Sequence, residues 1–126
     1  MVSRRVIFWD VDTQVDFMQP EGKLYVPGAE KLLPNLNLLT DAARRNEVFL
    51  VSDACVHGPD DEEFKRFPPH CLRGTPGAAI VPETIASTSA YETARSAMAR
   101  SNESFEAVRS PDRAWSKASV APHIFA

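Results

Sequence analysis

The sequence feature that most constrains the fold is an apolar run, Val6–Trp9, that turns acidic within a few residues. A short run of this kind is typical of a buried strand in a parallel sheet. Asp10, Asp12 and Asp16 lie at or just after its end. Ligands of open α/β sheets bind outside the carboxyl ends of the strands, so we expect this strand to deliver carboxylates to a site.

A helix and a second strand are predicted after this first strand, which we place at residues 5–11. Leucine and alanine recur at three- and four-residue spacing between positions 29 and 45 and form one apolar face. Pro34 falls inside this span, so the regular helix is predicted to begin there, with proline in its first turn. Residues 47–52 form the second strand. This order is a βαβ unit and predicts an α/β fold with a parallel sheet.

Composition and charge exclude several classes of protein. The 126 residues are enough for one modest domain. A formal net charge of −3 and the lack of any basic run argue against binding to nucleic acid or to a membrane surface. No apolar stretch approaches the ~20 residues of a membrane span. Two cysteines without a secretory signal predict reduced thiols in a cytoplasmic protein.

The character of the chain changes near residue 85. Residues 86–126 contain no leucine and no glycine and are rich in alanine and serine. A central parallel strand needs branched aliphatic residues, and only a weak helix over Tyr91–Arg109 is indicated. We therefore expect residues 1–85 to be the N-terminal part of a larger α/β domain. Residues 86–126 are predicted to be an atypical tail, weakly helical or disordered.

Asp12 stands where the first strand ends, in the position of a general base or of a group that orients a nucleophile. The alternative is that Asp12 or Asp16 caps a turn through its side chain. Spacing alone does not separate these roles. Asp10 lies within the strand, and we expect its role to be structural.

The long irregular segment 53–77 carries several metal-ligand side chains. Neutral imidazoles from His57 and His70, with a carboxylate or thiolate, suit a divalent metal, zinc above all. Cys55 and His57 are two residues apart and share a face of an extended chain end. Asp53 joins them only if the chain bulges or turns. The alternative is that both histidines lie on the surface without a ligand.

Two phenylalanines flank these polar groups. Phe17 and Phe67 are placed to sandwich a flat ring, although packing in the core is the commoner use of phenylalanine. Cys71 is a poor candidate nucleophile, because no base is identifiable beside it and small buried cysteines are common.

Three motifs resemble the nicotinamidase branch of the isochorismatase-like cysteine hydrolases: Asp12–Phe17, Leu24–Gly28 and Phe67–Gly77. The resemblance covers residues 5–85. It implies an α/β three-layer fold with helices on both sides of a parallel sheet, and we expect this chain to hold a truncated form of it. It also implies hydrolysis of a small amide such as nicotinamide by an Asp-Lys-Cys triad, through an acyl-enzyme thioester.

The resemblance also implies roles for single residues. Asp12 corresponds to the triad aspartate, which takes the proton from the thiol. His57 and His70 correspond to the metal-binding histidines, and zinc is the expected ion. Phe17 corresponds to the aromatic residue that lines the substrate pocket, and Phe67 stands where relatives often carry tryptophan.

The chain departs from this family in two respects. Relatives carry Asp-x-His at the metal site, whereas Cys55 holds that Asp position here and Asp53 lies two residues earlier, so either side chain is a candidate ligand. No cysteine follows Cys71, and the only lysine of the tail, Lys117, is not preceded by a predicted strand. We therefore predict that this chain alone does not hydrolyse the amide.

Two other functions remain open. The first is a non-catalytic metal- or partner-binding remnant, whose exposed sheet edge would favour a homo-oligomer. The second is an aspartate-nucleophile phosphatase, suggested by Asp10 and Asp12 after an apolar strand. In that class threonine usually follows the second aspartate by two residues, where this chain has Gln14.

Overall fold

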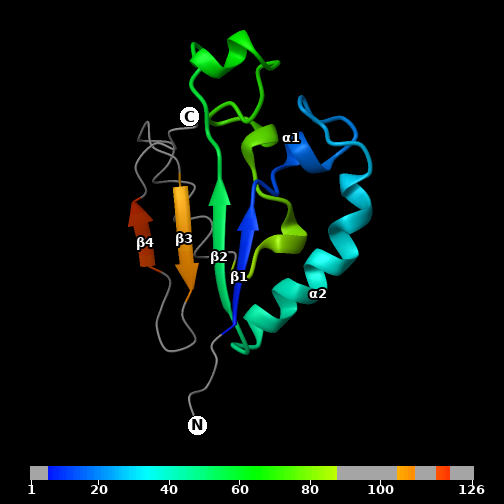
Figure 1. Cartoon of the computed structure of the whole chain (residues 1–126), viewed down its shortest axis with the longest axis vertical. Helices are drawn as coiled ribbons and strands as arrows, with labels where there is room; N and C mark the ends of the chain where they lie inside the picture. Colours follow the sequence, from blue (N-terminus) through cyan, green and yellow to red (C-terminus); the bar gives the residue numbers. More distant parts are fainter. Residues whose placement is uncertain (1–5, 88–104, 110–115, 120–126) are drawn as a thin grey trace.

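The computed structural model describes residues 6–87, 105–109 and 116–119, which form a four-stranded sheet with helical segments beside it (Figure 1). Strand β1 (Ile7–Val11) is parallel to strand β2 (Phe49–Ala54). The predicted α/β arrangement with a parallel pair of strands is therefore confirmed.

The connection between these strands holds a short helix α1 (Val15–Met18), a 3₁₀ turn η1 (Ala29–Leu32) and the long helix α2 (Leu33–Arg44). Pro34 lies in the first turn of α2, as predicted, because its missing N–H and fixed φ are tolerated there. Helix α2 runs beside the sheet and returns the chain to the start of β2 (Figure 1). The predicted βαβ order is confirmed.

Strand β2 begins and ends two residues later than predicted. Asn46 has a left-handed φ of 61° directly after α2. The N–H groups of Asn46 and Glu47 donate to the carbonyls of Ala43 and Ala42, at 3.0 and 2.9 Å. Because this helix cap uses residues expected in the strand, the strand starts later and Asp53 falls inside it.

Two further strands extend the sheet beyond β2. Strand β3 (Phe105–Arg109) is antiparallel to β2, and strand β4 (Ser116–Ser119) is antiparallel to β3. The weak helix predicted over Tyr91–Arg109 is thus wrong for its last five residues, and the rest lies outside the described residues. The unpaired edge of β2 offers backbone groups that β3 satisfies, which overrides weak local preference. Lys117, which follows no strand predicted from the sequence, lies within β4.

The segment after β2 folds over the carboxyl ends of both parallel strands (Figure 1). It contains three 3₁₀ turns, η2 (Glu62–Lys65), η3 (Pro76–Ala78) and η4 (Pro82–Thr84). A bridge between Gln14 and Ile80 ties this segment to the chain after β1. The irregular segment predicted at residues 53–77 is therefore held against the carboxyl ends of β1 and β2.

A small apolar core joins this segment to α1 and α2. Met18, Ala29 and Val81 are buried together, and Leu33 and Leu36 of α2 pack against them. Within the described part of the chain, no helix combines the length and the apolar character needed to cross a bilayer.

Candidate metal centre

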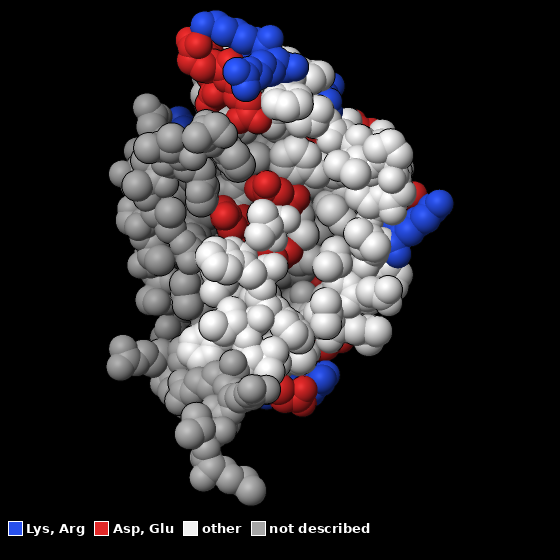
Figure 2. Space-filling view, in the orientation of Figure 1, with Lys and Arg blue, Asp and Glu red and all other residues white. Residues whose placement is uncertain are grey.

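Asp12 follows β1 directly and turns the chain away from the sheet. Its φ of 55° is left-handed, a region that aspartate enters more readily than most residues. The N–H of Asp12 donates to the Asp53 carbonyl at 3.0 Å, so the two parallel strands end side by side. Figure 2 shows acidic side chains gathered in a recess at this edge of the sheet.

A backbone bridge brings the two predicted histidines together. The N–H of His57 donates to the Cys71 carbonyl, and the N–H of Arg73 donates to the His57 carbonyl, each at 3.0 Å. This pairing lays the chain after β2 against the Pro-Pro-His-Cys turn. The rings of His57 and His70 have centroids 4.9 Å apart. Both residues are buried, with 7% and 2% of their surface exposed.

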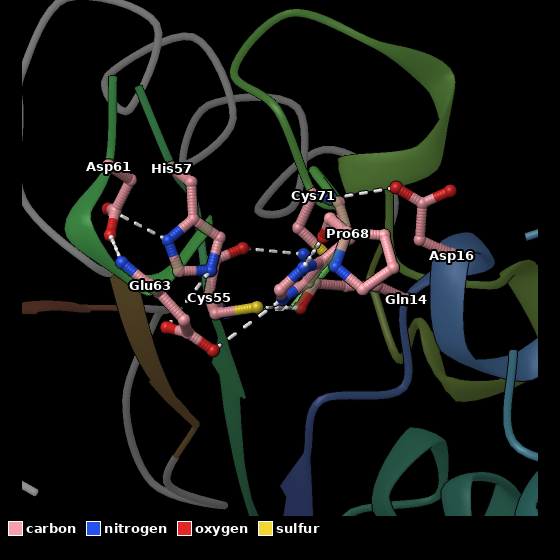
Figure 3. Close-up of polar contacts among 9 residues, drawn as sticks. Gln14, Asp16, Cys55, His57, Asp61, Glu63, Pro68 and Cys71 are labelled. Carbon is pink, nitrogen blue, oxygen red and sulfur yellow. Dashed lines mark hydrogen bonds and ion pairs between the residues drawn. The ribbon is translucent and has the colours of Figure 1, made fainter. Parts of the chain in front are cut away.

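Each imidazole is oriented by an acceptor on its Nδ1 atom. His57 Nδ1 lies 2.9 Å from Asp61 Oδ2, and His70 Nδ1 lies 2.8 Å from the Pro68 carbonyl oxygen. A carbonyl or an ionised carboxylate only accepts, so each Nδ1 donates in these contacts, and Nε2 is the ring atom left for a metal ion. Figure 3 shows Asp61 beside the His57 ring. This arrangement is typical of metal-binding histidines.

Cys55 supplies the third donor. Its Sγ atom and a ring nitrogen from each of His57 and His70 all lie within 4.8 Å of one another. The Gln14 carboxamide donates to the Cys55 carbonyl at 2.6 Å and accepts from the Cys55 N–H at 3.0 Å. The neighbouring Cys71 thiol and burial raise the pKa of Cys55, so the metal-free thiol is protonated. A bound cation would reverse this preference.

Glu63 faces both histidines from η2. Its Oε2 is 3.8 Å from His57 Nε2, and its Oε1 is 3.8 Å from His70 Nε2. His57 Nε2 is buried and has no hydrogen-bond partner. A buried polar atom is rarely left in this state, and a metal ion would satisfy it. Two imidazoles, a thiolate and a carboxylate fit zinc in number and kind.

Aromatic rings stand beside the histidines. Phe17 lies 5.4 Å from the His70 ring, and Phe64 lies 5.4 Å from His57 and 5.7 Å from His70, measured between centroids. Phe67 is 46% exposed. The structure therefore brings Phe17 to the cluster as predicted and adds Phe64. The role of Phe67 stays a prediction.

Comparison with known proteins identifies the family. The family model described as the isochorismatase domain matches residues 7–108, most of the chain. The chain belongs to the isochorismatase family. No curated protein sequence matches this isochorismatase-family chain significantly.

Several solved structures of nicotinamidases and pyrazinamidases are similar to the chain. The pyrazinamidase of Pyrococcus horikoshii, solved in complex with zinc, is 31% identical with a TM-score of 0.57, over 61% of this chain and 45% of that one. The nicotinamidase/pyrazinamidase of Bacillus subtilis is 26% identical with a TM-score of 0.59, over 71% of this chain and 49% of that one. This isochorismatase-family chain thus spans less than half of either neighbour's length.

Asp12 of this isochorismatase-family chain lies near enough to Cys55 to act on it electrostatically. Besides the Cys71 thiol and burial, the negative charges of Asp12 and Glu63 contribute to the raised pKa of Cys55. Asp10 instead accepts a hydrogen bond from Thr13 Oγ1 at 2.9 Å, and burial raises its pKa. These contacts agree with the structural role predicted for Asp10.

Asp53 lies outside the cluster. The described residues form two candidate ligand groups, Cys55 with His57 and His70, and His57 with Asp61 and Glu63. Asp53 is in neither group, because β2 extends through Ala54 and keeps Asp53 within the strand.

Asp16 supports the turn that carries His70. Its carboxylate is buried and accepts the N–H of Cys71 at 2.7 Å and the N–H of Lys23 at 3.0 Å. Cys71 has a left-handed φ of 44°, so this hydrogen bond offsets the strain of the turn. These contacts agree with the turn-capping role that the sequence offered for Asp16.

The sequence reasoning missed Gln14, Asp61, Glu63 and Phe64. The acidic run Asp60–Glu63, shortly after His57, was a signal for the two acids. Gln14 gave no such signal, because its partner Cys55 is 41 residues away in the sequence.

Proposed function

We propose that Cys55, His57, His70 and Glu63 bind a zinc ion in a site that serves the hydrolysis of a small aromatic amide. The observation that carries the zinc site is the buried Nε2 of His57, which has no hydrogen-bond partner and lies with two other donors. The reaction is the one for which the neighbouring nicotinamidases and pyrazinamidases are named. A bound zinc ion would supply a localised positive charge and hold Cys55 as a thiolate.

The chain's own residues favour a flat ring as substrate. The Phe17 ring lies against His70, and Phe64 contacts both histidines. Aromatic faces pack well against a heteroaromatic ring, while nearby polar groups orient an amide. We propose Phe17 and Phe67 as walls of this subsite, with Phe64 holding the histidines in place.

Asp12 is proposed as the base that accepts a proton from an attacking thiol. Neither cysteine of these 126 residues suits that thiol. Cys55 belongs to the metal cluster, and its pKa is raised by the Cys71 thiol and by burial. Cys71 is fully buried. We therefore propose that the 126 residues alone bind zinc but do not release ammonia from nicotinamide or pyrazinamide.

Metal titration tests the site directly. We expect one zinc ion per chain by calorimetry, and a near-ultraviolet thiolate-to-cobalt band when Co²⁺ replaces zinc. Cys55→Ser should abolish the band, while the matched variant Cys71→Ser should keep it. Failure of the wild-type chain to bind zinc stoichiometrically would refute the proposed site.

The amidase part of the proposal has a separate test. Ammonia release from nicotinamide and pyrazinamide is measured with the zinc-loaded chain, and we expect none. Turnover that Asp12→Ala abolishes would show that the nucleophile lies within these residues and would overturn the assignment above.

A non-catalytic metal-binding protein is the second candidate. It is favoured by one observation: all four proposed ligands lie within the described residues, whereas no suitable nucleophile does. One zinc ion per chain without turnover would favour this candidate over the amidase. The result would be decisive if turnover stayed absent after addition of the part of a longer family member that this chain does not match.

A further inference from the structure

The two cysteines of the chain lie side by side at the metal cluster. The bridge between His57 and Leu72 sets the residues before and after His57 beside the turn that contains Cys71. The Cys71 thiol is the largest cause of the raised pKa of Cys55, which places the two thiols close together. Figure 3 shows both side chains in the same part of the cluster, near Gln14.

We propose that Cys55 and Cys71 form a reversible disulfide whose formation excludes the metal from the cluster. The inference rests on the proposed zinc site, because Cys55 is shared between the two states. A disulfide sulfur has no thiolate to donate, and the remaining imidazoles and Glu63 would make a weaker site. Zinc and the disulfide therefore exclude each other.

The backbone prepares the pair for this bond. Gln14 holds both backbone groups of Cys55, and Asp16 holds the N–H of Cys71. Disulfides have strict geometric requirements, and two neighbouring cysteines on restrained backbones meet them more readily than two on mobile segments.

The exposures of the two thiols assign the order of events. Cys55 is partly exposed, while Cys71 is fully buried. A small oxidant would therefore reach Cys55 first, and Cys71 would act as the resolving thiol.

The chemistry balances with a hydroperoxide as oxidant. The Cys55 thiol loses its proton as its sulfur attacks one oxygen of hydrogen peroxide, the O–O bond breaks, and the released hydroxide takes up that proton to become water. The Cys71 sulfur then displaces the hydroxyl of the Cys55 sulfenic acid, and its thiol proton leaves with that hydroxyl as a second water. Two electrons pass from the two sulfurs to the peroxide, and one S–S bond forms.

The test treats the purified chain with hydrogen peroxide and reads two signals. Intact mass should fall by two hydrogen atoms, and digestion should recover a peptide that links positions 55 and 71. Removal of a residue that supports a metal ligand lowers metal affinity by about 10–100-fold. Oxidation should lower zinc affinity by more than this, and a thiol reductant should restore it. Circular dichroism before and after oxidation checks that the fold survives.

Two variants sharpen the result. Cys71→Ser keeps every proposed ligand but cannot form the bridge, so the same mild treatment should stop at the Cys55 sulfenic acid and yield no linked peptide. Cys55→Asp keeps an oxygen ligand and should retain zinc without forming any disulfide.

The outcomes separate this inference from the proposed function. If reduced wild-type protein never binds zinc, the zinc site fails, and the proposed coupling fails with it. If zinc binds but no 55–71 peptide forms, or if the wild-type chain with the 55–71 bridge still binds zinc as the reduced chain does, the disulfide switch is overturned and the zinc site stands.

Discussion

The side chain of Gln14 bonds to both backbone groups of Cys55, as a neighbouring strand would. Its carboxamide also donates to the Ala78 carbonyl at 2.9 Å, so one buried residue joins the ends of both parallel strands to the loop above them. The position of Cys55 relative to the histidines therefore depends on a residue that is not itself a candidate ligand.

Replacing Gln14 by Ala should weaken zinc binding and destabilise the fold. The Cys55 N–H and carbonyl would lose their partners inside the protein, which costs about 1–3 kcal/mol of unfolding free energy for each unsatisfied group. Zinc affinity should fall by about 10–100-fold. Urea denaturation and zinc competition measure the two effects. Asn37→Ala, which removes a carboxamide bonded only to Arg44 among the described contacts, is the control. Equal zinc affinity in both variants would contradict a positioning role.

Asp61→Asn should lower zinc affinity by about 10–100-fold with little loss of stability. The carboxylate of Asp61 holds the Nδ1 proton of His57 and also caps η2 by accepting the N–H of Glu63 at 2.9 Å. Asparagine caps nearly as well but is a weaker acceptor for the imidazole. Calorimetry with zinc measures the change. The control is Glu62→Gln, which removes the charge of an exposed neighbour. An equal loss of zinc affinity in this variant would show that net negative charge, and not the contact with His57, causes the effect.

Gly77→Ala should cost about 1–3 kcal/mol of unfolding free energy. A Cβ atom at Gly77 would overlap the carboxylate of Asp16, which holds the turn with Cys71. The matched control is Gly58→Ala, because a Cβ there meets no atom within 4 Å. Thermal or urea unfolding of both variants decides the point, and equal midpoints would show that Asp16 moves aside without cost.

Asp10→Asn should stabilise the protein at neutral pH. Burial raises the pKa of Asp10 above 3.8, so the folded state favours its neutral form. Its contribution to stability is full below the unfolded pKa and is lost as pH rises through the folded pKa. The advantage of Asp10→Asn should therefore shrink as pH falls toward 4. Urea midpoints across this range test the trend, with the exposed Asp60→Asn as control, and an advantage that grew on acidification would contradict it.

Trp9→Lys should reduce self-association. Strand β1 is at one edge of the described sheet, and Ile7, Trp9 and Val11 are 60%, 61% and 55% exposed. An exposed apolar edge strand pairs readily with another chain, and a lysine on it opposes pairing. Sedimentation velocity over a concentration series measures the change. Leu38→Lys removes an exposed apolar residue from α2 instead, and an equal effect there would exclude a specific role for the edge.

The sequence predicted the elements whose signals are local. The apolar face of α2 with Pro34 in its first turn and the apolar runs of β1 and β2 depend on residues close together in the chain. The two histidines were predicted to meet because each lies in a segment beyond the end of β2. The strand conformation of residues 105–109 was not predictable in this way, because strand β3 forms through pairing with β2 rather than through its own propensity.

The sequence by itself determined the family motifs, the parallel pair of strands and the donor types available for a metal. Only the tertiary structure decided that Cys55 rather than Asp53 meets the histidines, and that Gln14, Asp61 and Glu63 surround them. The physical reason is separation along the chain. Gln14 and Cys55 are 41 residues apart, and Asp16 and Cys71 are 55 apart. Contacts of this range depend on where β1, β2 and the loop above them come to lie, and no local pattern encodes that.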